Sequence, residues 1–155
     1  MYLHRIAISL AMVALLTACS SKPDWTEYQH PTGKITISFP TSTTPSGDGT
    51  GSALSVVWKD TSYTVSWADT ENLTDEEFVA QCDQAAARLG KVNSGSRAAA
   101  AGLRGREYSI TGGDGRIFVR YLRGENRVYL FHIEGPKLDA SAEVPQAFLA
   151  SFSVN

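Results

Sequence analysis

The 155-residue sequence is short of cysteine, of net charge and of long hydrophobic runs. Its two cysteines are too few for a small domain held together by several disulfides. Its formal net charge of -2 gives no reason to expect nucleic acid as a partner. Because 43% of the residues are hydrophobic, a wholly disordered chain is excluded, and the length suits one domain.

Sequence motifs that would assign an enzymatic activity are also missing. No Gly-x-Ser-x-Gly nucleophile motif occurs, and the glycine-rich run at 47–51 lacks the Lys-Ser/Thr ending of a phosphate-binding loop. His132 and Glu134 would share one face of a strand, but a metal site normally needs three or more protein ligands. Cys82 falls on the apolar side of an expected helix, where a free cysteine packs as a small hydrophobe. We expect no catalytic residue, no metal and no bound cofactor.

The N-terminal residues are typical of a targeting segment. Arg5 is followed by an uncharged apolar run from Ile6 to Ala18, whose 13 residues are too few to cross a bilayer as a helix. The run closes on Leu16-Thr17-Ala18-Cys19, which resembles the lipobox of bacterial lipoproteins. The resemblance implies cleavage before Cys19, a diacylglycerol thioether on its sulfur and an acyl group on its new amino end. We therefore predict a signal peptide over 1–18, with an ordinary secretory signal as the alternative.

Lipidation of Cys19 would make the lipid bilayer a partner of the chain. Two or more acyl chains anchor a protein stably, whereas one chain binds marginally. Residues 19–24 would then be the lipidated cysteine and a short polar linker, and a single domain would follow over 25–155. By the sorting rules of bacterial lipoproteins, Ser20 after the cysteine favours the outer membrane, with the domain facing the periplasm.

Alternating apolar residues predict strands in the first half of the domain. A short strand is expected at 25–28, a second at 34–39, and a hairpin at 54–58 and 63–67. A two-residue turn at Asp60-Thr61 would place Trp58 opposite Tyr63. The Ser/Thr/Gly-rich segment 41–52 is predicted to be a loop.

Helix signals and a strand meander follow in the second half. Thr74 and Glu77 form a capping box that predicts a helix from Asp75 to Leu89. Residues 91–102 favour an irregular strand, and a helix is expected over about 141–150 with Pro145 in its first turn. Between them lie three strands at 103–111, 116–123 and 127–134. A turn at Gly113-Asp114 would place Glu107 opposite Arg120. Both faces of this sheet carry large apolar residues, so we expect a helix to cover each face.

Several of these segments, in this order, resemble the PsbP/Mog family. The resemblance covers about residues 25–155. It implies an α+β fold in which a twisted antiparallel sheet of about six or seven strands is sandwiched between helices. The family includes lumenal photosystem accessory proteins, a Ran-binding protein and bacterial lipoproteins, so the resemblance implies no catalytic residue. The matching pieces are Gly33 to Pro40, Tyr63 to Asp69, Gly102 to Glu107, Arg120 to Gly124, Arg127 to Tyr129 and Phe148 to Phe152.

Basic residues are unevenly distributed along the chain. Residues 85–127 hold nine basic residues against three acidic ones, whereas residues 20–84 are strongly acidic. The two parts can neutralise each other in the fold, or the arginines can form a surface for anions. In the predicted register Arg104, Arg106 and Arg123 share one sheet face, so we predict an anion-binding site there. Its partner would be an anionic lipid, an anionic polymer or an acidic protein.

These observations predict a membrane-anchored cell-envelope lipoprotein that acts as a binding or scaffolding module. The alternative is an enzyme, or an accessory subunit of an envelope enzyme, whose site is not recognisable from the sequence.

Overall fold

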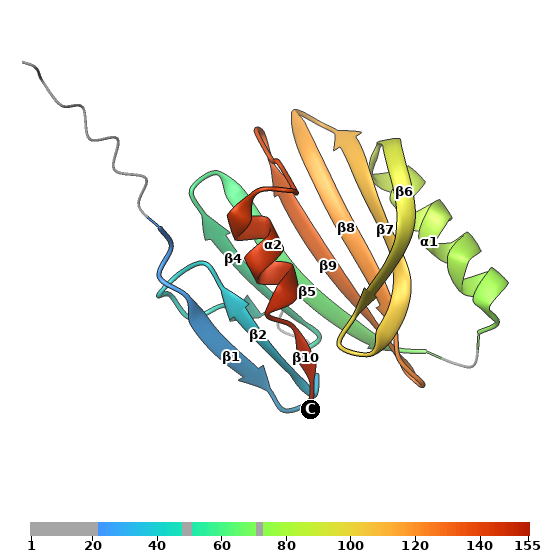
Figure 1. The fold of residues 1–155 in the computed structure, drawn as a ribbon, viewed down its shortest axis with the longest axis horizontal. Coiled ribbons are helices and arrows are strands. Elements are labelled where there is room, and N and C mark those ends of the chain that lie inside the picture. The colour runs from blue at the N-terminus through green and yellow to red at the C-terminus, as the bar shows by residue number, and fades with distance from the viewer. Residues whose placement is uncertain (1–21, 48–50, 71–72) are drawn as a thin grey trace, which may run out of the picture.

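The structure, a computed structural model, describes residues 22–47, 51–70 and 73–155 (Figure 1). The predicted signal peptide over 1–18 and the predicted lipidation site at Cys19 therefore lie outside the described residues. Within the described ranges, none of the helices has the length and apolar character needed to cross a membrane.

Two antiparallel sheets and two helices make up the described part of the chain. The large sheet has seven strands in the order β3-β4-β5-β9-β8-β7-β6, and the small one has the order β1-β2-β10. This architecture confirms the expected α+β fold built on an antiparallel sheet. The elements are β1 Thr26–His30, β2 Ile35–Phe39, β3 Ser46–Gly47, β4 Ala53–Trp58, β5 Thr61–Asp69, α1 Asp75–Leu89, β6 Lys91–Ala100, β7 Leu103–Gly112, β8 Gly115–Arg123, β9 Arg127–Gly135, α2 Glu143–Ala150 and β10 Ser153–Val154.

The connection through α1 determines how the large sheet is assembled. After β5 the chain passes through α1 to the far edge of the sheet, and β6 to β9 then return strand by strand until β9 pairs with β5 (Figure 1). Strand β6 is therefore an edge strand. It is irregular as expected, since its register with β7 shifts between Val92 and Ser94.

Helix α1 has the bounds that the sequence predicts. The Thr74 hydroxyl accepts a hydrogen bond from the Glu77 amide at 3.2 Å, and the Glu77 carboxylate accepts one from the Thr74 amide at 2.7 Å. This capping box satisfies two amides that the helix itself leaves without partners. Gly90, with φ of 151°, ends the helix. Helix α2 begins at Glu143, two residues after the predicted start, so that Pro145 lies in its first turn.

The register of the β4–β5 hairpin differs from the prediction by two residues. Trp58 lies opposite Thr61, and Val56 lies opposite Tyr63. The turn consists of Lys59 and Asp60, because Lys59 adopts a left-handed conformation with φ of 52°. The predicted buried face is nevertheless correct. In the predicted loop 41–52, Ser46–Gly47 pairs with β4.

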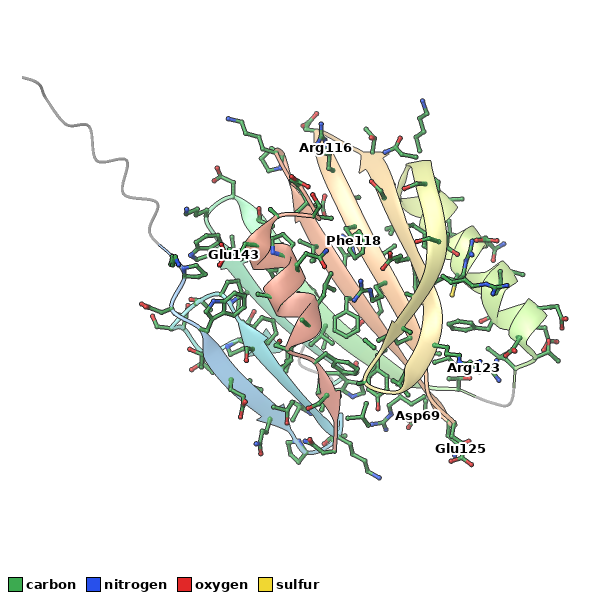
Figure 2. The ribbon with its side chains drawn as sticks, in the orientation of Figure 1. Asp69, Arg116, Phe118, Arg123, Glu125 and Glu143 are labelled. Atoms are coloured by element: carbon green, nitrogen blue, oxygen red, sulfur yellow. The ribbon has the colours of Figure 1, made fainter. Side chains whose placement is uncertain are left out.

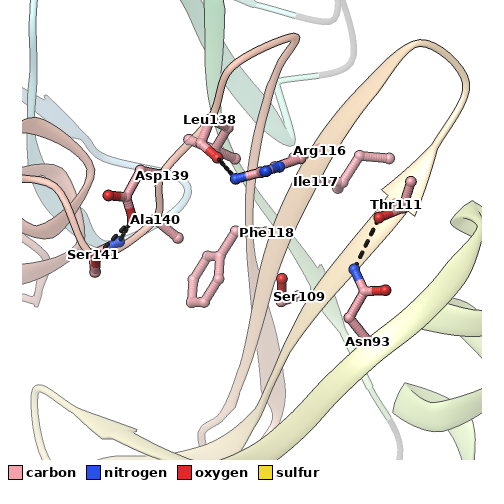
Figure 3. A pocket seen from close by; sticks show the side chains of 10 residues that line it. All are labelled: Asn93, Ser109, Thr111, Arg116, Ile117, Phe118, Leu138, Asp139, Ala140 and Ser141. Carbon is pink, nitrogen blue, oxygen red and sulfur yellow. Dashed lines mark hydrogen bonds between the residues drawn. The ribbon is translucent and has the colours of Figure 1, made fainter.

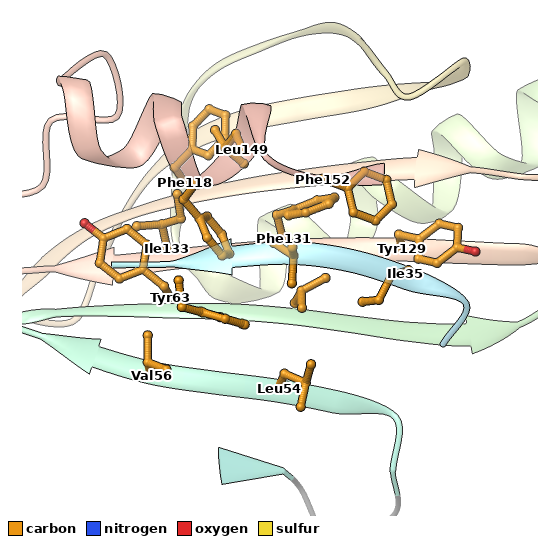
Figure 4. Close-up of a cluster of buried hydrophobic side chains, with 14 of the residues drawn as sticks. Ile35, Leu54, Val56, Tyr63, Phe118, Tyr129, Phe131, Ile133, Leu149 and Phe152 are labelled. Carbon is orange, nitrogen blue, oxygen red and sulfur yellow. The ribbon is translucent and has the colours of Figure 1, made fainter. Parts of the chain in front are cut away.

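Two apolar clusters fill the two sides of the large sheet. On one side, α1 covers the cluster that contains Tyr108, Val119 and Tyr121. On the other, α2 and the small sheet enclose the larger cluster, which includes Phe131 and Phe152 (Figure 4). Both sheet faces are therefore covered, as expected, but the small sheet was not predicted and does part of the covering.

The small sheet seals the edge of the larger cluster. The alternating residues Ile35, Ile37 and Phe39 of β2 are fully buried against it. Gly33 lies against the indole of Trp67, and a Cβ at this position would come within 2.9 Å of Trp67 Cε2. The ring of His30 stacks on the same indole with centroids 4.5 Å apart. Trp67 therefore joins the large sheet to the β1–β2 turn.

Candidate functional site

The predicted arginines do share one face and one end of the large sheet. Arg104 on β7 lies directly opposite Arg123 on β8. Arg106, two residues along β7, lies opposite Arg97 on β6, a residue that the sequence analysis did not single out. We call Arg97, Arg104, Arg106 and Arg123 the arginine surface. Two pairs of like charges directly across neighbouring strands are unfavourable for the sheet unless other groups compensate them.

Helix α1 provides the carboxylate that offsets the charge of Arg106. The guanidinium Nη2 of Arg106 lies 3.7 Å from Oδ1 of Asp83, and its Nε donates to the Tyr108 hydroxyl at 3.3 Å. That hydroxyl in turn donates to Asp83 at 2.6 Å. Burial, together with the hydrogen bond to Asp83, raises the pKa of Tyr108 to about 12, so the phenol stays protonated. Arg106 is thus part of the packing of α1 on the sheet.

Arg123 is bonded to residues at the start of the same helix. Its Nη1 lies 3.0 Å from Oδ1 of Asp75, and its Nη2 donates to the carbonyl oxygen of Leu73. The guanidinium also lies over the ring of Phe78, with 5.8 Å to the centroid. These contacts attach the N-terminal turn of α1 to β8.

Arg97 and Arg104 differ from the other two. Both are exposed, and within the described ranges neither forms an ion pair or a side-chain hydrogen bond. Since Arg104 lies opposite Arg123 and Arg97 opposite Arg106, the free guanidinium groups lie on adjacent strands at the same sheet end. Arginine presents a planar fork of donors that fits carboxylates and phosphates. Two exposed guanidinium groups without a carboxylate partner in the described ranges therefore lie at this end of the sheet.

A polar cleft of about 360 Å³ lies on the opposite face, between β7, β8 and the chain that joins β9 to α2 (Figure 3). Arg116 Nη1 donates to the carbonyl oxygen of Leu138 at 3.4 Å at one end of it. At the other end the Ser141 hydroxyl donates to Asp139 at 2.6 Å. Hydrogen bonds from Ser141, and the charge of Arg116, hold the pKa of Asp139 below its usual value. The lining residues are Asn93, Ser109, Thr111, Arg116, Ile117, Phe118, Leu138, Asp139, Ala140 and Ser141.

The lining of this cleft is mainly polar. It contains no histidine or cysteine, and it contains two serines, Ser109 and Ser141. The Ser141 hydroxyl donates to Asp139, a carboxylate that is a weak base because its pKa is lowered. Arg116 and the amide of Asn93 could contact a small polar molecule. Asn93 already donates to Thr111 at 2.9 Å, so its orientation is fixed.

The histidine and the cysteine considered in the sequence lie elsewhere. His132 Nε2 is 3.3 Å from Oε2 of Glu134, on the sheet face opposite the larger core cluster. The described ranges bring no group of three potential metal ligands together. Cys82 is 3% exposed in the cluster beneath α1, and burial raises the pKa of its thiol to about 12. It packs as an apolar residue, as expected.

Comparison with known proteins supports the fold rather than an activity. No protein-family model matches the sequence, and no curated protein does. Among solved structures, the solution structure of cyanobacterial PsbP (CyanoP) from Synechocystis sp. PCC 6803 is similar, with a TM-score of 0.60 and 10% sequence identity. The similarity covers 90% of this chain and 99% of that chain. The chain therefore has a PsbP-like fold.

Proposed function

We propose that the protein is a lipid-anchored cell-envelope module that binds an acidic segment of a protein partner at the arginine surface. In this proposal Cys19 carries the lipid, the domain faces the periplasm from the outer membrane, and the protein acts by binding. The observation that carries the proposal is the pair of exposed guanidinium groups of Arg97 and Arg104. Each lies opposite another arginine and has no carboxylate of its own in the described ranges.

The edge strand β6 favours a protein over a lipid or a polysaccharide. All ten of its residues are exposed or half-buried, and its outer side borders no other strand of the sheet. Such an edge presents backbone N–H and C=O groups that another polypeptide can pair with. Arg97 lies on β6 itself, and Arg104 lies on the strand beside it. An extended acidic segment could therefore pair with the edge and place its carboxylates against the arginines.

The position of the arginine surface relative to the predicted anchor also favours a partner outside the anchoring bilayer. Lys22, the first described residue, and Glu143 line the same cleft. Figure 2 shows Glu143 and Arg123 toward opposite ends of the long axis of the molecule. A bilayer that holds a lipid on Cys19 would approach the end at Lys22. The arginines would then point away from it.

The enzyme alternative would have to use the polar cleft at Arg116. Of the two serines in its lining, Ser141 donates to the poorly basic Asp139, and the lining contains no histidine that could act as a base for either. We therefore propose a non-catalytic role for the cleft as well.

The test measures the binding of a fluorescent poly-glutamate peptide to the full-length lipidated protein in neutral detergent. We expect binding that weakens with added salt and falls about tenfold in the Arg97→Gln/Arg104→Gln variant, since two ion pairs of about 0.7 kcal/mol each are lost. The matched control is Lys34→Gln/Lys137→Gln, which removes the same charge from exposed positions elsewhere and should bind like wild type.

Two results would overturn the proposal. One is peptide binding that the two variants weaken equally, which would reflect net charge alone. The other is arginine-dependent binding to phosphatidylglycerol vesicles without binding to the peptide, which would make the ligand a lipid.

A further inference from the structure

A second cleft, of about 260 Å³, lies where the first described residues meet the β4–β5 turn and helix α2. Two of the three tryptophans of the chain, Trp25 and Trp58, form part of its wall. The lining residues are Lys22, Pro23, Trp25, Trp58, Lys59, Glu143, Val144 and Ala147. We call Lys22, Trp25, Trp58 and Lys59 the tether surface, because they lie where the chain leads back toward the predicted anchor.

One of the two tryptophans of the tether surface is exposed. The Trp25 side chain is 41% exposed, and it is one of the four large hydrophobic residues that are exposed in the described ranges. Trp58 is half-buried: it packs against the larger core cluster and lines the cleft. By contrast Trp67, the third tryptophan, is buried in the core. One exposed and one half-buried tryptophan ring at the same end of the domain suit a partner that accepts both apolar and polar groups.

The lysines complete a pattern suited to the polar–apolar boundary of a bilayer. Lys59 Nζ lies over the Trp58 ring, 4.3 Å from its centroid, so an ammonium group and an indole project from the same turn. Tryptophan is enriched at membrane–water interfaces because its ring is apolar and its N–H is polar. Lysine can keep its charged end among headgroups while its stem covers apolar surface.

The length of chain before the structure begins determines how near the bilayer would be. Lys22 follows Cys19 by three residues, so the two Cα atoms can be at most about 11 Å apart. A diacylglycerol on Cys19 would lie in the hydrocarbon, with the cysteine at the headgroup layer, which is about 5–8 Å thick on each side. Lys22 would then be held within reach of the headgroups, and the cleft that it lines lies at this end of the domain.

We propose that the tether surface contacts the headgroup region of the phospholipid bilayer and inserts the rings of Trp25 and Trp58 into it. This inference rests on the proposed lipid anchor at Cys19. Acidic residues near the same end, among them Glu143 and Asp60, offset the two lysines. The contact therefore depends on the indoles rather than on net charge, and a zwitterionic bilayer is sufficient for it.

The experiment uses the full-length lipidated protein in phosphatidylcholine vesicles whose acyl chains are brominated near the glycerol end. Bromine quenches tryptophan fluorescence only at contact. We expect wild-type fluorescence to be quenched, and the quenching to be greater than with bromine near the chain ends. The Trp25→Phe/Trp58→Phe variant should lose nearly all of the quenching, because the remaining Trp67 is buried. Phenylalanine keeps an aromatic ring at both positions, and circular dichroism of the variant reports its folding.

Flotation of the same vesicles separates this inference from the anchor on which it rests. If the protein does not float with the vesicles and carries no fatty acid, the anchor fails. If the protein is lipidated and floats but its fluorescence is the same with and without bromine, the tether surface does not touch the bilayer and the inference is wrong. Quenching that persists unchanged in the double variant would also overturn it.

Discussion

Glu107 and Arg120 face each other on neighbouring strands, and the guanidinium Nε and Nη2 of Arg120 lie 3.0 and 2.8 Å from Oε2 of Glu107. The other carboxylate oxygen accepts a hydrogen bond from the hydroxyl of Ser96 at 3.1 Å. Strands β6, β7 and β8 are thus joined by one carboxylate. The side chains of Arg120 and Glu107 are 15% and 26% exposed, so water screens this pair less than a surface pair.

The change Glu107→Gln should lower the free energy of unfolding by about 1–2 kcal/mol, because it removes charge-assisted hydrogen bonds while keeping the shape of the side chain. Urea unfolding measures the loss. Ser96→Ala is the control, since it removes only one exposed hydrogen bond to the same carboxylate, leaves the ion pair with Arg120 intact and should cost less. Equal stability of the wild type and Glu107→Gln would mean that the pair contributes nothing to the sheet.

The capping box predicts a specific dependence of stability on pH. Hydrogen bonds from the backbone and side chain of Thr74 lower the pKa of Glu77 below its ordinary value of 4.5. The contribution of Glu77 to stability is therefore fully present above pH 4.5, and it is lost as the pH falls through the lower value in the folded protein. Wild type should be more stable than Glu77→Gln at pH 7, and the difference should shrink in acid. A difference that stays constant down to pH 2 would contradict this.

The change Trp67→Ala should destabilise the protein by about 3–5 kcal/mol, because it removes a large buried ring from the larger core cluster. Its contacts with Gly33 and His30 join two sheets, so thermal unfolding should report the loss for the whole domain. Trp25→Ala, at an exposed position, is the control and should unfold close to the wild-type temperature. If the two variants unfold alike, the burial assigned to Trp67 is wrong.

Helix α1 and the β7–β8 register could be predicted because their signals are local. Thr74 and Glu77 define the helix start within four residues, and the short turn at Gly113-Asp114 fixes which residues of the meander face each other. The β4–β5 register could not be predicted, because it depends on Lys59 adopting a left-handed conformation that lysine rarely takes. No sequence pattern indicates that Lys59 adopts it.

The small sheet and the arginine partners were missed for a different reason. Strand β10 is two residues long and pairs with β2 across more than a hundred positions of sequence, so no periodic pattern marks it. Likewise Asp75 and Asp83 meet Arg123 and Arg106 only because α1 packs across β7 and β8. Strand alternation was enough to predict that the arginines share a face. The folded chain was needed to show which of them remain without an ion pair.

Lipidation of Cys19 should be detectable by growing cells with a clickable fatty acid. The wild-type protein should be labelled, and Cys19→Ala should lose the label completely, because the thioether and the processing that follows it both require that sulfur. Cys82→Ala should be labelled like wild type, since its thiol is buried in the core. Equal labelling of wild type and Cys19→Ala would refute the anchor.

The central claim is that the arginine surface and the β6 edge bind an acidic segment of a protein, and cross-linking in cells tests it most directly. A photoreactive amino acid at Ala99, exposed on β6 opposite Arg104, should cross-link to a protein whose attached peptide is rich in Asp and Glu. The adduct should disappear in Arg97→Gln/Arg104→Gln and persist in Lys34→Gln/Lys137→Gln, and the same probe at Gln29 on β1 should give none. An adduct from Ala99 that does not depend on the arginines, or whose attached peptide is not acidic, would contradict the account.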